Sequence, residues 1–271
     1  MFEEAFMVRA LIAALILCPL CGLTGVYVTA RRMAFFGETV AHGALAGVAV
    51  GLILGVSSSI TVALFSVLIA TALLWLKEKT ELMTDSIMAL LLSTSISLGV
   101  ILMSRMRGDN RGEVHRILFG DILAVSTGDL VAAGVLAVVV MIGFITYMNE
   151  LTLITANEDL ALICGIPVRK YNYLFILALT LTVATSVRLV GILLVTPLLV
   201  IPSAAARNIS RTLRKQIITS TGIGALCGVG GIILAYQLNV PTGPTIVLSC
   251  AGCFILTLII KALRRPSSRK A

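Results

Sequence analysis

Glu38 and His42 are the residues of this 271-residue chain whose types and spacing point most directly to chemistry. They are four positions apart, so a helix places the carboxylate and the imidazole on one face, about one turn from each other. Ionisable side chains inside an apolar segment are costly and are functional candidates by default. A carboxylate with an imidazole forms a ligand set suited to zinc, manganese or iron. A hydrogen bond between the two side chains that only packs helices together is the alternative that the pattern leaves open.

Two ligands from one chain are too few to hold a divalent ion well. A second copy related by a two-fold axis would supply two Glu and two His, the four ligands that zinc prefers. The metal hypothesis therefore predicts a homodimer. If the chain is helical from Arg32 onward, His42 lies about 15 Å along the helix, near the bilayer midplane. Both side chains could also titrate there, which keeps a proton-coupled secondary transporter open as a second function.

The composition defines the fold class. Hydrophobic residues make up 58% of the chain and charged residues 13%, and the mean hydropathy is +1.06. A soluble domain carries about 25% charged residues, so soluble enzymes, disordered tails and secreted disulfide scaffolds are excluded. We expect an all-α, polytopic helical membrane protein that forms a single transmembrane domain over residues 1–271. The net charge of +8 comes from Lys and Arg between the apolar segments, so no nucleic-acid partner is expected.

Apolar stretches near the length that crosses a bilayer predict the spans. Nine are expected, and eight is the alternative, because the sixth is short and its junction with the seventh is tight. Most of the 21 basic residues fall between spans on one side, which favours an N-out, C-in orientation. The predicted spans are residues 7–29, 38–56, 59–76, 84–103, 128–147, 171–187, 189–206, 216–237 and 244–262.

A glycine series follows the Glu38/His42 pair at helical spacing. Gly43, Gly47 and Gly51 are each four residues apart, and Gly55 continues the series. Small residues at this spacing form a stripe that permits close approach of a neighbouring helix. We therefore expect this span to pack centrally while its polar face looks into a pathway.

One outer segment breaks the charge pattern. Residues 104–116 carry Arg105, Arg107 and Arg111 although the predicted topology places them outside. These arginines are therefore expected to have a role on the outer face. The piece 117–125 that follows is too short to span alone and is expected to be re-entrant or interfacial.

The longest inner segment predicts a short amphipathic helix. Asn157 can cap it, Glu158 and Asp159 suit its positive N-terminal end, and Gly165 and Pro167 would stop it. Such a helix on the cytoplasmic face is a docking element for another protein, with an ordinary connecting loop as the alternative.

Catalytic motifs point away from an enzyme. The chain has no Gly-x-x-x-x-Gly-Lys-Ser/Thr loop, so ATP hydrolysis is expected on a separate subunit. It also has no Gly-x-Ser-x-Gly nucleophile motif. Cys18-x-x-Cys21 and Cys250-x-x-Cys253 have metal-like spacing, but packing is the favoured role, because no second ligand pair lies nearby in sequence. An intramembrane metalloenzyme is disfavoured, since the chain has two histidines.

The segment Arg31–Ala49, RRMAFFGETVAHGALAGVA, resembles the signature of permease subunits of bacterial zinc/manganese/iron ABC importers, most closely those of high-affinity zinc uptake. The resemblance covers nearly the whole chain. Further matching stretches are Leu118–Ser126, Glu158–Gly165, Val190–Val195 and Ile201–Arg207.

The resemblance implies a homodimer in the bacterial inner membrane, with two cytoplasmic ATPase subunits and a periplasmic metal-binding protein. It implies a divalent metal as transported substrate, with zinc favoured, and no permanently bound cofactor. Metal passage falls to Glu38 and His42, although the family usually has Asp where this chain has Glu38, which leaves metal selectivity less secure.

Two further sets of residues gain roles from the resemblance. The helix at about 157–167 becomes the coupling helix seated in the ATPase, with Glu158, Asp159, Ala161 and Gly165 as its coupling residues. The outer arginines, Arg105, Arg107 and Arg111, become docking sites for acidic patches on the binding protein.

Overall fold

The computed structural model describes residues 5–56, 58–104, 120 and 125–264. Every regular element in these ranges is an α-helix, in agreement with the predicted fold class. The helices are α1 (Ala5–Ala30), α2 (Phe36–Leu54), α3 (Ser58–Lys79), α4 (Thr84–Ser104), α6 (Thr127–Thr146), α7 (Met148–Ala156), α8 (Glu158–Ile163), α9 (Val168–Val190), α10 (Ile192–Ile209), α11 (Leu213–Leu238) and α12 (Thr242–Arg264).

Within the described ranges, nine helices are long and apolar enough to cross a membrane: α1, α2, α3, α4, α6, α9, α10, α11 and α12. Each lies within a few residues of a predicted span, so nine spans are confirmed and eight is wrong. The doubtful junction is a single residue, Gly191, between α9 and α10. Its φ of 98° lies in a region that glycine adopts without steric cost. One glycine is therefore enough to separate two spans that hydropathy barely resolves.

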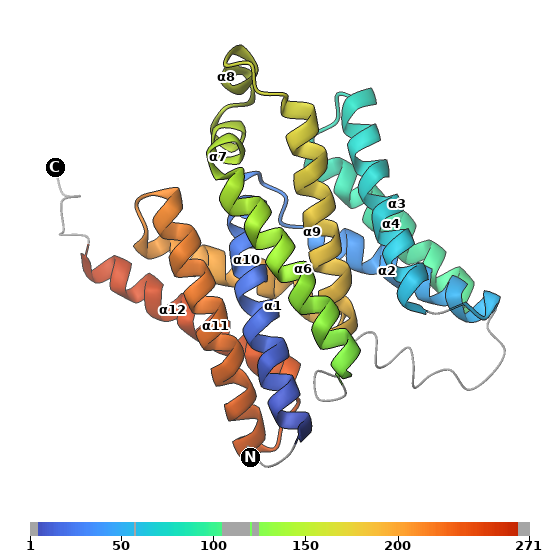
Figure 1. Cartoon of the computed structure of the whole chain (residues 1–271), viewed down its shortest axis with the longest axis vertical. Coiled ribbons are helices and arrows are strands. Elements are labelled where there is room, and N and C mark those ends of the chain that lie inside the picture. Colours follow the sequence, from blue (N-terminus) through green and yellow to red (C-terminus); the bar gives the residue numbers. More distant parts are fainter. Residues whose placement is uncertain (1–4, 57, 105–119, 121–124, 265–271) are drawn as a thin grey trace.

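Helix α2 occupies the centre of one half of the bundle. It packs against α3, α4, α9 and α10, while α1 packs against α10 and α11, and α12 closes on α10 and α11. Helix α6 links the two groups by contacting α1 and α9. Figure 1 shows α2 crossing the bundle obliquely, whereas α6, α9 and α11 run lengthwise. One buried apolar cluster contains residues from all nine spanning helices.

The glycine series of α2 faces α3 at close range. A methyl group at Gly47 would lie 2.7 Å from the carbonyl oxygen of Thr61 and 2.9 Å from Cβ of Phe65. Gly43 and Gly51 meet side chains of the same helix. The expected close approach is confirmed for these three glycines. Gly55 has a different role, because it ends α2 in the left-handed conformation at φ 68°.

The two ends of the bundle carry different ion pairs. At one end, α3, α8 and α9 are joined by Lys77–Glu158 at 4.0 Å and Arg169–Glu78 at 2.7 Å. This is the end at which α7 and α8 lie, at the top of Figure 1. At the other, Arg188 pairs with Asp129 at 2.9 Å. The N-out, C-in orientation stays a prediction, and it makes the α8 end cytoplasmic. The expected re-entrant piece lies outside the described residues except for Gly120 and Val125.

The close α2–α3 contact yields a stability prediction. Gly47→Ala should lower the free energy of unfolding by about 1–3 kcal/mol, because the new methyl group meets α3 backbone that cannot yield easily. The measurement is thermal unfolding of the purified chain in detergent. Gly143→Ala in α6 is the matched control, since nothing lies within 4 Å of that site. Equal stability of the two variants would contradict the packing role of Gly47.

Candidate functional site

A tight turn sets where α2, the helix that carries Glu38 and His42, begins. The N–H of Met33 donates to the carbonyl of Val28 at 2.9 Å, and the N–H of Arg32 donates to that of Thr29 at 3.3 Å. Arg32 has a φ of 56°, so the turn is a Schellman motif with arginine in the position that glycine usually takes. The prediction of an unbroken helix from Arg32 is therefore wrong. His42 lies six residues into α2, about 9 Å from its start, whereas an unbroken helix from Arg32 would place it about 15 Å along.

Glu38 and His42 are the only side chains that are not buried in the first fourteen residues of α2. Over positions 36–49, every residue is buried except these two, which are half-buried. The four-residue spacing puts them on one face, as expected. Over these positions the helix therefore presents only a carboxylate and an imidazole to its surroundings.

Neither side chain is engaged in packing hydrogen bonds. No hydrogen bond joins Glu38 to His42, and the buried Nδ1 of His42 has no partner in the described part of the chain. A hydrogen bond between them that only packs helices is therefore not what the structure contains. A buried polar atom without a partner is uncommon in folded proteins and calls for an explanation such as a ligand or ion.

The pair is not completed within one chain. Among the described residues, no group of three or more His, Cys, Asp and Glu side chains is arranged to hold a metal ion. Cys227 of α11 lies near Cys250 and Cys253 of α12, although the three thiols do not form such a group. Sequence analysis missed this proximity, because the two helices' cysteines are far apart along the chain.

The predicted short helix is confirmed as α8. The side chain of Asn157 accepts a hydrogen bond from the N–H of Leu160 at 3.0 Å, which is the expected N-cap. At the other end, Gly165 has a φ of 76°, and the N–H of Ile166 donates to the carbonyl of Ala161 at 3.1 Å. This Schellman closure ends α8 earlier than the expected 157–167, and Pro167 is the N-cap residue of α9. Sequence analysis did not predict the preceding helix α7.

The predicted coupling residues divide by orientation. Ala161 is fully buried in a small cluster with Ile154 and Val168, so it fastens α8 to the bundle. Asp159 and Gly165 are exposed, as are the apolar side chains Leu160, Leu162 and Ile163, the last with 83% of its surface accessible. Helix α8 therefore offers an apolar and acidic surface to a partner.

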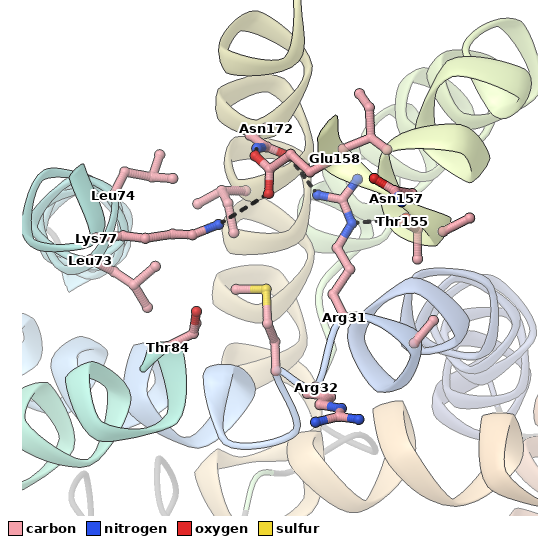
Figure 2. A pocket seen from close by; sticks show the side chains of 15 residues that line it. Arg31, Arg32, Leu73, Leu74, Lys77, Thr84, Thr155, Asn157, Glu158 and Asn172 are labelled. Atoms are coloured by element: carbon pink, nitrogen blue, oxygen red, sulfur yellow. Dashed lines mark hydrogen bonds and ion pairs between the residues drawn. The ribbon is translucent and has the colours of Figure 1, made fainter. Parts of the chain in front are cut away.

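Glu158, the fourth predicted coupling residue, reaches toward the bundle. Its carboxylate lies 4.0 Å from Nζ of Lys77 and accepts a hydrogen bond from the amide of Asn172 at 3.0 Å. These residues line a pocket of about 300 Å³ between α1, α3, α7 and α9. Figure 2 shows Lys77 and Arg31 approaching Glu158 and Asn172 from opposite sides.

Arg31 is the last member of a series of polar contacts that runs from Lys77 through Glu158 and Asn172. Its Nη1 donates to Asn172 at 2.8 Å, its Nε donates to Thr155 at 3.0 Å, and the guanidinium lies 4.3 Å from the ring centre of Phe175. Burial lowers the pKa of Arg31 to about 10, and the charge of Glu158 opposes that shift. The side chain therefore remains a cation at neutral pH. Sequence analysis gave no function to Arg31, because its partners follow it by more than a hundred residues.

The expected outer docking residues cannot be placed. Arg105, Arg107 and Arg111 lie outside the described residues.

Comparison with known proteins decides the family. Residues 3–261 match the sequence profile of the ABC 3 transport family. The chain belongs to the ABC 3 transport family. It is 33% identical over 258 residues to the high-affinity zinc uptake system membrane protein ZnuB of Haemophilus influenzae, with 95% of this chain and 98% of that one covered. It is 30% identical over 265 residues to the manganese import system permease protein ScaB of Streptococcus gordonii, with 98% and 95% covered.

A solved structure agrees with the ABC 3 assignment. The structure of PsaBC from Streptococcus pneumoniae in complex with Fab superposes with a TM-score of 0.83 at 28% identity, covering 97% of this chain and 96% of that one. The predicted resemblance to ABC importer permeases is thereby confirmed. With nine apolar spans in the described part, the chain is a multi-pass protein of the inner membrane.

The N-cap of α8 yields a prediction. Asn157→Ala should make the backbone amides of residues 158–163 exchange with solvent faster, because loss of a cap costs about 0.5–2 kcal/mol of helix stability. Hydrogen–deuterium exchange of the purified chain measures this. Asn157→Asp keeps the accepting oxygen and should exchange like the wild type. Protection that is unchanged in the alanine variant would show that the cap does not hold α8.

Proposed function

We propose that this chain is the membrane-spanning subunit of an ATP-driven importer of a divalent transition metal, with zinc favoured. The observation that carries the proposal is the wall of α2, buried over positions 36–49 except at Glu38 and His42. Relatives named for zinc uptake and manganese import support the substrate class. The chain would have no enzymatic activity of its own, and ATP would be hydrolysed on a separate subunit.

The ligand types favour zinc. Imidazole suits zinc, whereas manganese prefers a set made wholly of carboxylate, carbonyl and water oxygens. Two copies facing each other would offer two carboxylates and two imidazoles, the number of ligands in a tetrahedral zinc site. One chain offers only half of that set, which is why we propose a homodimer. A transported ion must also leave again, and ligands from two half-buried pairs would bind it more weakly than a closed structural site.

We assign the two remaining partners to opposite ends of the bundle. We propose that α8 sits on a cytoplasmic ATPase dimer, through the exposed Leu160, Leu162 and Ile163. At the other end, a periplasmic metal-binding protein would deliver the ion, with Arg105, Arg107 and Arg111 as candidate contacts for its acidic patches.

Uptake by the reconstituted complex tests the metal pair. Glu38→Gln or His42→Ala should reduce zinc uptake to background while the subunits still copurify, because each change removes one ligand from each copy. Glu38→Asp keeps the carboxylate that the family usually carries at this position, and it should retain uptake. Wild-type uptake in both ligand variants would remove the site assignment. Uptake by the purified chain alone, driven by a pH gradient, would replace the proposal with proton-coupled transport.

The α8 surface is tested by assembly. Ile163→Arg should abolish copurification of the ATPase, because it puts a charge into the apolar part of the contact. Leu82→Arg is the matched control, since Leu82 is also an exposed apolar residue, in the connection between α3 and α4, and lies outside α8. Equal loss of assembly in both variants would argue against a contact centred on α8.

A further inference from the structure

The guanidinium of Arg31 is partly buried and forms no ion pair among the described residues, although the charge of Glu158 is close enough to act on its pKa. Its two hydrogen bonds go to the neutral side chains of Thr155 and Asn172, and its Nη2 is buried with no partner in the described part of the chain. None of the ion pairs among the described residues includes Arg31. Burying a cation in this way is costly unless it is paired with an anion. The guanidinium therefore has one donor, Nη2, that a carboxylate could fill.

The carboxylate that could fill it is the one that opens α8. Glu158 lies across the amide of Asn172 from Arg31, since that amide accepts from Arg31 and donates to Glu158. Its present ion pair with Lys77 is long, 4.0 Å, and both side chains are 43–49% exposed. Exposed pairs of this kind contribute only about 0–1 kcal/mol. The pocket beside them, of about 300 Å³, leaves space for the carboxylate to move.

We propose that Glu158 moves between two partners, Lys77 in the conformation described here and the free Nη2 of Arg31 when the ATPase displaces α8. This inference rests on the proposed function and makes Arg31 and Glu158 positioning residues for transport. The exchange trades a weak exposed pair for a buried charge-assisted hydrogen bond, which is about twice as strong as a neutral one.

The position of Arg31 connects this exchange to the metal helix. Arg31 is the last residue before the left-handed Arg32, and the same turn leads into α2 and Glu38. A pull on the guanidinium therefore acts on the α1–α2 turn directly, seven residues before the first proposed ligand. Lys77 is on α3, the helix against which the glycines of α2 pack. Glu158 would thus hold α3 in one state and the start of α2 in the other.

The test uses the complete reconstituted complex and measures metal ions imported per ATP hydrolysed. Glu158→Gln should leave ATPase assembly and hydrolysis in place but lower this ratio about tenfold, the effect of losing one hydrogen bond to a charged group. Arg31→Gln should do the same, and the double variant should be no worse than the lower single variant, because both changes remove one interaction. Glu158→Asp and Arg31→Lys keep the charges and should recover part of the ratio.

Glu78→Gln is the matched control. Glu78 lies next to Lys77 on α3 and pairs with Arg169 of α9 at 2.7 Å, so its loss removes a shorter ion pair without touching α8. Its ratio should equal that of the wild type. A wild-type ratio in Glu158→Gln, an equal fall in Glu78→Gln, or additive losses in the double variant would each overturn the inference. A wild-type complex that hydrolyses ATP without importing metal would instead overturn the proposed function, and the inference with it.

Discussion

The enclosure of α2 is the constraint that shapes this protein. A polar face inside a membrane is tolerated only where it lines a pathway or meets other polar groups. Here α3 approaches through Gly43, Gly47 and Gly51, and the contacts with α4, α9 and α10 cover the remaining sides. The carboxylate and the imidazole are consequently the only side chains in the first four turns that the packing leaves free. The packing of α2 and the direction of its polar side chains are thus linked, because the glycines that seat the helix also fix where Glu38 and His42 point.

At the α8 end, charged side chains from several helices contact one another. Thr155, Asn172 and the ring of Phe175 contact Arg31. The amide of Asn172 accepts a hydrogen bond from Arg31 and donates one to Glu158. The Nη2 donor of Arg31 has no acceptor among the described residues, and a network with such an unpaired donor is less stable than one that is fully hydrogen-bonded. In a transporter this is useful, since two conformations of similar free energy are needed, and a fully paired network would favour one of them strongly.

Local signals in the sequence predicted the features that local physics determines. Apolar length placed nine spans, and the oxygen of Asn157 three residues before Leu160 placed the cap of α8. The predictions that failed involved a residue in an unusual backbone conformation or residues far apart in the sequence. The left-handed turn at Arg32 was missed because glycine normally occupies that position, and this shifted His42 toward one end of its helix. The Arg31–Asn172 hydrogen bond was missed because only the folded bundle brings those segments together.

The position of His42 along α2 places the proposed metal pair close to a group of basic residues. His42 lies about 9 Å from the N-terminal end of α2, which is the end that follows the turn at Arg32. The basic residues Arg31, Arg32 and Lys77 gather at that same end, where they repel a divalent cation. An ion that reaches Glu38 and His42 from the other side would therefore meet a positive barrier ahead of it. Movement of Glu158 toward Arg31 would reduce the positive charge next to α2. One displacement of α8 would therefore both shift the turn at Arg32 and lower the electrostatic barrier to the ion.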